Sequence, residues 1–106
     1  RAGLAPLAND DALARVAQEK ARDMQANGYF SHTSPTYGSP FEMMRQFGVS
    51  YTYAAENIAK GYRTPAEVVA GWMGSSGHRA NILNANLTNL GVGVAGDVWV
   101  QMFRRP

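Results

Sequence analysis

The longest amphipathic pattern in the chain lies between Asp11 and Asn27. Its apolar residues recur at helical spacing and form one stripe: Leu13, Val16, Ala17, Ala21 and Met24. The preceding Asn9-Asp10-Asp11 supplies a capping side chain and carboxylates suited to the positive end of a helix dipole. Asn27-Gly28 is a typical helix end. We therefore predict a helix that packs on a core through this stripe.

Two shorter helices are predicted further along. The first covers Pro40 to Phe47, with Phe41, Met44 and Phe47 facing inward. The second begins after Thr64, because Thr64-Pro65-Ala66-Glu67 combines a hydroxyl cap, a first-position proline and the glutamate of a capping box. Its expected inner face consists of Val68, Val69, Trp72 and Met73, and its end carries the residues from Ser75 to His78.

Three segments have the character of strands. Tyr53 to Ala59 is one, and it carries Glu56 within it. Leu90 to Ala95 and Val98 to Phe103 form a hairpin across Gly96-Asp97. Pairing Ala95 with Val98 places apolar residues on both faces of this hairpin, so each face needs a covering layer. The expected fold is α+β, a three-layer α-β-α sandwich around a small antiparallel sheet, in which glycines on one face let a helix approach closely.

Composition narrows the class of protein. The chain has 106 residues, 45% hydrophobic and 17% charged, which fits one globular domain. No apolar run reaches the ~20 residues of a membrane helix, so no membrane span is expected. A net charge of +2 with scattered arginines argues against nucleic acid as a partner. The absence of cysteine excludes disulfides, thiolate nucleophiles and cysteine zinc sites.

The chain has two histidines, and each lies in a run of small, polar and turn-forming residues. There an imidazole can titrate near neutral pH or ligate a metal, although a hydrogen-bonded structural histidine is the alternative. Glu56 lies among apolar neighbours, where burial is costly unless the carboxylate is paired. It is expected to orient an imidazole or to accept a proton. If His32, Glu56 and His78 converge, they provide a four-coordinate zinc site with an open position, with Glu56 as ligand or as base toward bound water.

Four motifs occur in a fixed order. They are Ser31-His32-Thr33-Ser34-Pro35, then Ala55-Glu56-Asn57-Ile58-Ala59, then Trp72-Met73-Gly74-Ser75-Ser76-Gly77-His78-Arg79-Ala80-Asn81-Ile82-Leu83, and then Gly91-Val92-Gly93-Val94. Together they resemble the CAP superfamily of cysteine-rich secretory proteins, insect antigens and plant pathogenesis-related proteins. The similarity is greatest to its cysteine-free bacterial branch, and it extends from Arg1 to about Phe103.

The resemblance implies an α-β-α sandwich, a location that is secreted or associated with the cell wall, and a cleft containing His32, Glu56 and His78. Two positions depart from the family pattern: Ala55 replaces a glycine, and Ser75 stands where many eukaryotic members have a second glutamate. A mechanism that needs two carboxylates is therefore disfavoured. Ser75 and Ser76 are interpreted as a helix terminus, and Asn57 and Asn81 as hydrogen-bonding groups that tie segments together.

Two functions remain open at this point. The favoured one is an extracellular binding module in which His32 and His78 share a divalent metal such as zinc, with Glu56 nearby, and the cleft takes a small-molecule, lipid-like or cell-surface ligand. The alternative is a metal-assisted hydrolase of peptidase type in which Glu56 is the general base.

The N-terminus suggests a larger protein. Arg1-Ala2-Gly3-Leu4-Ala5-Pro6-Leu7 matches only the tail of the opening segment of the bacterial branch. We therefore expect residues 1–106 to be a single domain whose opening helix is truncated, with an apolar patch left for that helix to cover.

Overall fold

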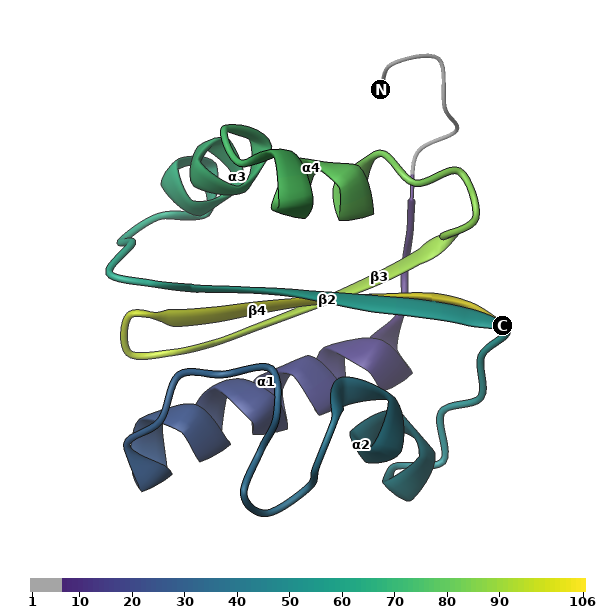
Figure 1. Cartoon of the computed structure of the whole chain (residues 1–106), viewed down its shortest axis with the longest axis horizontal. Helices are drawn as coiled ribbons and strands as arrows, with labels where there is room; N and C mark the ends of the chain where they lie inside the picture. The colour runs from purple at the N-terminus through teal and green to yellow at the C-terminus, as the bar shows by residue number, and fades with distance from the viewer. Residues whose placement is uncertain (1–6) are drawn as a thin grey trace.

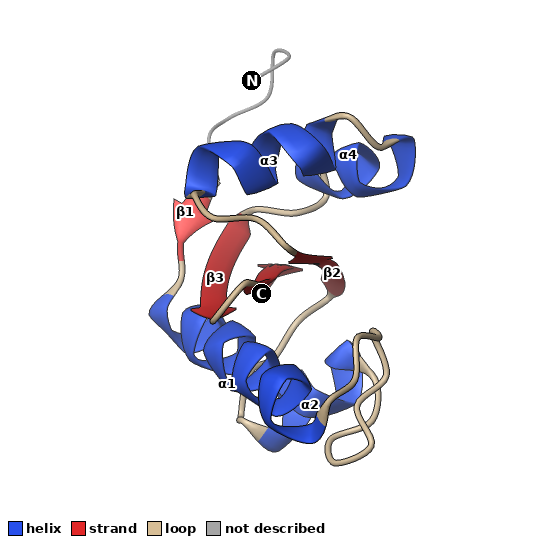
Figure 2. Ribbon diagram, turned by 90° about the vertical axis from the view of Figure 1, so that its left-hand side faces the viewer, coloured by secondary structure: helices blue, strands red, loops and turns tan. Residues whose placement is uncertain are grey.

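The computed structural model describes residues 7–106, which form four helices and four strands. In chain order these are β1 (Ala8–Asn9), α1 (Asp11–Asn27), α2 (Pro40–Gln46), β2 (Tyr53–Lys60), α3 (Pro65–Met73), α4 (Ser76–Ile82), β3 (Asn89–Ala95) and β4 (Val98–Arg105). The strands form one sheet in the order β1-β3-β4-β2. The sheet lies between a layer of α1 and α2 and a layer of α3 and α4 (Figures 1 and 2). The predicted three-layer sandwich is therefore confirmed.

The sheet is antiparallel except at one edge. β2 and β3 both pair antiparallel with β4, and Ala95 pairs with Val98 as the hairpin pattern predicted. The short strand β1 pairs parallel with β3, which the sequence pattern did not predict. At the opposite edge, β2 has β4 as its neighbour on one side, and it crosses in front of β4 and β3 in Figure 1.

Helix α1 packs on the lower face of the hairpin, as seen in Figure 1, at two glycines. A methyl group at Gly91 would overlap the backbone of Leu13 and Ala14, and one at Gly93 would overlap the backbone of Ala17 and Gln18. The whole predicted stripe of α1 is buried there. Asp10 caps this helix by accepting a hydrogen bond from the Leu13 N–H, as its sequence indicated.

The inner face of α2 differs from the prediction. Pro40, Met43 and Met44 are its buried residues, while Phe41 is 39% exposed. Residues three and four positions apart share a helix face, so Pro40, Met43 and Met44 form one stripe and Phe41 lies beside it. Phe47 is half-buried and follows the last helical residue. The expectation that Phe41 faces the core was therefore wrong.

The inner face of α3 is narrower than predicted. Val68 and Trp72 are buried, one turn apart, whereas Val69 is 43% exposed and Met73 is half-buried. Glu67 does not complete the reciprocal capping box either, since its side chain accepts from the Arg63 N–H instead of the cap residue. A further difference lies beyond Met73, where the residues expected at the end of this helix begin the separate helix α4. His78 is consequently a helical residue.

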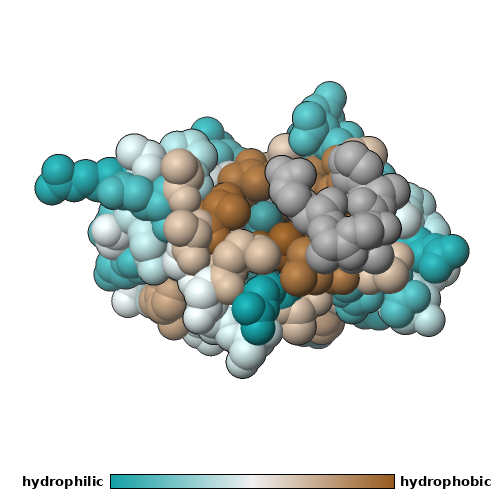
Figure 3. All heavy atoms as spheres, turned by 90° about the horizontal axis from the view of Figure 1, so that it is seen from above, coloured by the Kyte–Doolittle hydropathy of each residue, from teal (hydrophilic) through white to brown (hydrophobic). Residues whose placement is uncertain are grey.

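Within residues 7–106, α3 and α4 cover only part of the upper face of the sheet. Trp72 of α3 packs with Ala59 of β2 and Trp99 of β4. Toward the other edge, Val92 and Val94 of β3 keep 43% and 38% of their surface exposed. Figure 3, which looks onto this side of the molecule, shows hydrophobic residues gathered near the middle of this face. An apolar patch was expected where the truncated opening helix would pack, and of the Arg1–Leu7 segment that carried this expectation, Arg1 to Pro6 lie outside the described residues.

None of the helices within residues 7–106 has the length and the apolar run that crossing a membrane requires.

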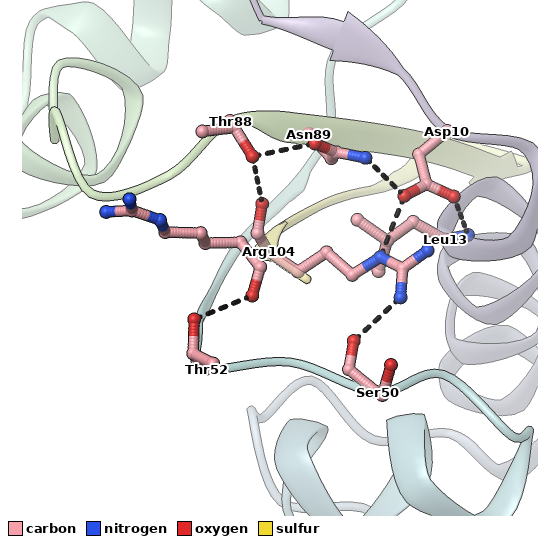
Figure 4. Close-up of polar contacts among 8 residues, drawn as sticks. Asp10, Leu13, Ser50, Thr52, Thr88, Asn89 and Arg104 are labelled. Carbon is pink, nitrogen blue, oxygen red and sulfur yellow. Dashed lines mark hydrogen bonds and ion pairs between the residues drawn. The ribbon is translucent and has the colours of Figure 1, made fainter.

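A part-buried ion pair joins Asp10, the cap of α1, to Arg104 of β4 (Figure 4). Arg104 Nε lies 2.8 Å from Asp10 Oδ2, and Asn89 Nδ2 donates to the same oxygen at 2.9 Å. The Arg104 guanidinium also donates to the Ser50 carbonyl at 2.7 Å. Burial alone would raise the pKa of Asp10. Hydrogen bonds from Arg104, Asn89 and the Leu13 N–H lower this pKa by more than burial raises it, so the net pKa is below its ordinary value.

Replacing Trp72 with alanine should destabilise the protein by ~3–5 kcal/mol, because a large buried aromatic side chain leaves a cavity. Trp72 also donates its indole N–H to the Ile58 carbonyl at 3.2 Å. Urea denaturation measures the loss. Val69→Ala on the same helix is the matched control and should change stability by no more than ~0.5 kcal/mol. Equal losses for the two variants would contradict the assignment of Trp72 to the core.

Asp10→Asn should lower stability at pH 7 by roughly 1.5–3 kcal/mol, because it keeps a capping side chain but removes the charge that Arg104 faces. Since the folded pKa of Asp10 is below its unfolded value, the stability from this carboxylate is present above pH ~4 and is lost as pH falls further. The difference between wild type and variant should therefore shrink on acidification, which denaturant midpoints measured from pH 7 to pH 2 would show. A stability difference between wild type and Asp10→Asn that stays constant from pH 7 to pH 2 would contradict this role of the Asp10 carboxylate.

Candidate functional site

The structure brings two of the three candidate residues together. His32, on the loop that follows α1, places Nδ1 2.7 Å from Oε1 of Glu56 on β2. The Glu56 side chain is 1% exposed, while that of His32 is 55% exposed. Glu56 Oε2 is also buried and has no hydrogen-bond partner among the described residues. The carboxylate therefore supports the imidazole from inside the protein, and the imidazole is the group that faces outward.

An open pocket of about 320 Å³ adjoins this pair. Seven residues line it: His32, Pro40, Phe41, Ala54, Ala55, Glu56 and Asn81. They come from the loop after α1, from α2, from the first half of β2 and from α4. Phe41 is exposed because its ring lines this pocket instead of filling the core. Most of the lining is apolar, and the His32 imidazole and the half-buried Asn81 amide are among its polar groups.

His78 occupies a different position. It lies in α4, where Nδ1 is 3.0 Å from the Ser75 hydroxyl, and it is not among the residues lining the pocket. Within residues 7–106, no three or more His, Asp or Glu side chains gather closely enough to hold a metal ion. Nδ1 of His32 and Oε1 of Glu56 are used in their mutual hydrogen bond, and Nδ1 of His78 lies against Ser75, so Nε2 is the ring atom of each histidine left for a ligand. The described residues therefore form no group of three such ligands, and a divalent metal shared by His32 and His78 stays a prediction.

Lys20, which the sequence pattern did not single out, lies directly behind the pair. Its side chain is fully buried, and Nζ donates to the His32 carbonyl at 2.6 Å. Burial lowers the pKa of Lys20, and the nearby carboxylates of Glu56 and Asp23 raise it part of the way back. The sequence does contain a sign that Lys20 is buried, because Lys20 is three residues after Ala17 and four before Met24, on the same helical stripe.

Asp23 fixes the loop that carries His32. It accepts hydrogen bonds from the side chains of Tyr29, Ser34 and Thr36, all on that loop. Burial raises the pKa of Asp23, but the bonds from Ser34 and Tyr29 lower it more, so the net pKa is below its ordinary value. The loop is thus held to α1 at Lys20 and at Asp23, which determines where the imidazole lies.

Amide side chains attach α4 to the other side of β2. Asn81 Nδ2 donates to Asn57 Oδ1 at 2.8 Å and to the Glu56 carbonyl at 3.3 Å. Asn57 Nδ2 in turn donates to Gln101 Oε1 at 3.0 Å and to the His78 carbonyl at 3.2 Å. Asn57 and Asn81 therefore tie segments together, as their positions in the motifs suggested. Ser75 is the residue before α4, in agreement with its interpretation as a helix terminus.

The model of the CAP family, the cysteine-rich secretory protein family, matches residues 1–103. The chain belongs to the CAP family. The uncharacterized protein YkwD of Bacillus subtilis is 56% identical to this CAP domain over 103 residues, which are 95% of the chain and 40% of that protein. The uncharacterized membrane protein YlbC of the same organism is 43% identical over 101 residues, covering 95% of the chain and 29% of that protein. The CAP domain thus spans less than half of either relative.

Solved structures show the same fold. An extracellular protein containing an SCP domain from Bacillus anthracis superposes with a TM-score of 0.97 at 40% identity, covering all of the CAP domain and 36% of that chain. An outer surface protein of Borrelia burgdorferi gives a TM-score of 0.86 at 24% identity, covering 98% of the CAP domain and 80% of that chain. The resemblance inferred from the four motifs is confirmed.

The site of this CAP domain has the chemistry of an imidazole oriented by a buried acid. A carboxylate that accepts a hydrogen bond from Nδ1–H fixes the tautomer and leaves the lone pair of Nε2 available. The carboxylate of Glu56 is too deeply buried to contact a ligand directly, so this side chain acts through His32. His32 can accept a hydrogen bond from a ligand or take a proton from one.

We predict that the neutral His32 ring is predominantly the Nδ1–H tautomer, because Nδ1 donates to Glu56. Two-bond and three-bond proton–nitrogen correlation spectra at pH 8.5 distinguish the two nitrogens. Glu56→Gln should shift the ring toward the Nε2–H form, whereas His78, without a carboxylate partner among residues 7–106, should respond little to that substitution. A predominant Nε2–H form in the wild type would contradict the proposed role of Glu56.

Proposed function

We propose that this CAP domain is an extracellular ligand-binding module whose binding centre is the pocket beside His32 and Glu56. The ligand places an apolar part against Pro40 and Phe41 and donates a hydrogen bond to Nε2 of His32. An extracellular location is supported by the 40% identity with the Bacillus anthracis protein, which is described as extracellular.

One observation carries the proposal. A carboxylate is buried almost completely in order to hold an imidazole that is itself more than half exposed at the mouth of a pocket. Burying a carboxylate is costly unless it is compensated. Here the partners are the imidazole on one side and the buried ammonium group of Lys20 nearby. This concentration of buried charge around one exposed ring is typical of a functional site.

A divalent metal shared by His32 and His78 remains a prediction of the sequence. His78 contributes nothing to the pocket lining, and the second oxygen of Glu56 is enclosed. We therefore base the proposed function on the His32–Glu56 pair without a metal.

Hydrolysis is the second candidate, and the orientation of His32 is the observation that favours it. With Nδ1 held by Glu56, Nε2 is placed to take a proton from water or from a substrate hydroxyl. In this version His32 is the general base and Glu56 is its positioning residue. The seven lining residues include no second carboxylate to act as a separate acid, so binding is the function better supported.

A fragment screen followed by nuclear magnetic resonance tests the binding proposal. Fragments that combine an apolar ring with a hydrogen-bond donor should shift the resonances of His32, Phe41 and Ala55. His32→Ala should weaken these fragments by at least ~10-fold, the loss of about one hydrogen bond.

His78→Ala is the matched control for the screen, since His78 is the other histidine and lies outside the pocket lining. It should change fragment affinities by less than ~2-fold. Fragments that bind elsewhere on the domain, or that bind the His32→Ala variant equally well, would contradict the proposal.

A further inference from the structure

We propose that the ligand of this site is a peptide in extended conformation, which adds as a fifth strand to the free edge of β2 at Ala54–Glu56. This inference rests on the proposed function, because the same pocket receives the peptide. The register of β2 and its unpaired backbone groups point to this occupant.

The register shows which backbone groups of β2 point away from the sheet. In an antiparallel pair, residues alternate between those that exchange both hydrogen bonds with the partner strand and those whose N–H and C=O point outward. The Gly61 N–H donates to the Asp97 carbonyl at 3.0 Å, and these two residues continue the β2–β4 register. Counting back in steps of two, Ala59, Asn57, Ala55 and Tyr53 face β4. The outward residues are therefore Ala54, Glu56, Ile58 and Lys60.

Two side chains already occupy part of this edge, and their positions confirm the alternation. Trp72 Nε1 donates to the Ile58 carbonyl at 3.2 Å, and Asn81 Nδ2 donates to the Glu56 carbonyl at 3.3 Å. Both acceptors are outward residues in the register above. Covering an edge with side chains from a helix is one way in which proteins prevent unwanted strand pairing. The second half of β2 is therefore blocked.

The first half of β2 has no such cover within the described part of the chain. The N–H and C=O of Ala54 and the N–H of Glu56 point outward, and no partner for them exists within residues 7–106. Ala54 is only half-buried, and it lines the pocket together with Ala55 and Glu56. Three backbone groups in the order donor, acceptor, donor are thus presented at the wall of the pocket.

This pattern of groups matches the backbone of an extended peptide. A neighbouring strand lies ~4.8 Å away and offers alternating N–H and C=O groups at the spacing of the three on β2. Side chains of such a peptide alternate between the two sides of the sheet. Those on the side of α2 lie next to Phe41 and His32, and those on the other side lie next to Asn81. A lipid chain has no donors or acceptors for these backbone groups, so we infer a peptide as the occupant.

The test uses a defined peptide, acetyl-Ser-Thr-Val-Thr-Val-Thr-Ser-amide, which has high β-propensity and no charge. Titration into isotope-labelled protein should move the amide proton resonances of Ala54 and Glu56 downfield and slow their exchange with solvent, because each gains an acceptor. The control peptide has the same sequence with its central amides N-methylated, which prevents strand pairing. It should not produce these changes.

Two proline variants separate edge pairing from other binding. Ala54→Pro removes an outward N–H without breaking the β2–β4 ladder, since proline is tolerated at such edge positions. It should weaken the peptide by at least ~10-fold. Lys60→Pro removes the equivalent outward N–H at the far end of the same edge, beyond the block formed by Trp72, and should leave affinity within ~2-fold.

The outcomes are distinguishable. Equal binding of the N-methylated peptide, or no response at Ala54 and Glu56 up to millimolar peptide, would overturn the inference whether or not Ala54→Pro folds. If fragments still bind at His32 in that case, the proposed function stands and its ligand is not an extended peptide. If fragments also fail to bind there, the proposed function fails with it.

Discussion

The close approach of α1 to β3 determines the rest of this structure. It requires glycine at positions 91 and 93, because any side chain there would overlap the helix backbone. With the helix lying this close to the sheet, Lys20 is enclosed completely and its ammonium group reaches the loop that carries His32. The position of the imidazole, and with it the position of the pocket, therefore follows from the packing of a helix on two glycines.

The edge strand β2 supplies both the buried carboxylate and the backbone groups at the pocket. Its lower side carries Glu56 into the protein beneath His32, and its outward carbonyls are taken by Trp72 and Asn81 over part of its length. The part left uncovered is the part that lines the pocket. The His32 imidazole and the uncovered backbone groups of β2 therefore face the same pocket, where both can contact one ligand. The hydrogen bond between His32 and Glu56 of this strand serves both, since it holds the loop and the strand together.

Local patterns predicted the elements whose signals are local. The stripe of α1, the cap at Thr64 and the hairpin across Gly96-Asp97 all depend on neighbours in sequence, and all were predicted correctly. Which of Phe41 and Met43 faces the core depends on a pocket formed by distant segments, and the pattern chose wrongly. The meeting of His32 with Glu56 was proposed from the motifs, but the place of His78 within the helix α4 and the burial of Lys20 were not predicted from local patterns.

The central claim is that β2 presents free backbone groups at Ala54 beside a fixed imidazole. Amide hydrogen exchange of the protein without ligand tests it most directly. The Ala55 N–H faces β4 and should exchange at least ~100-fold more slowly than the Ala54 N–H, which points outward. If Ala54 is instead protected to the same degree as Ala55, its N–H has a partner within the protein, and the edge of β2 is not available to a ligand.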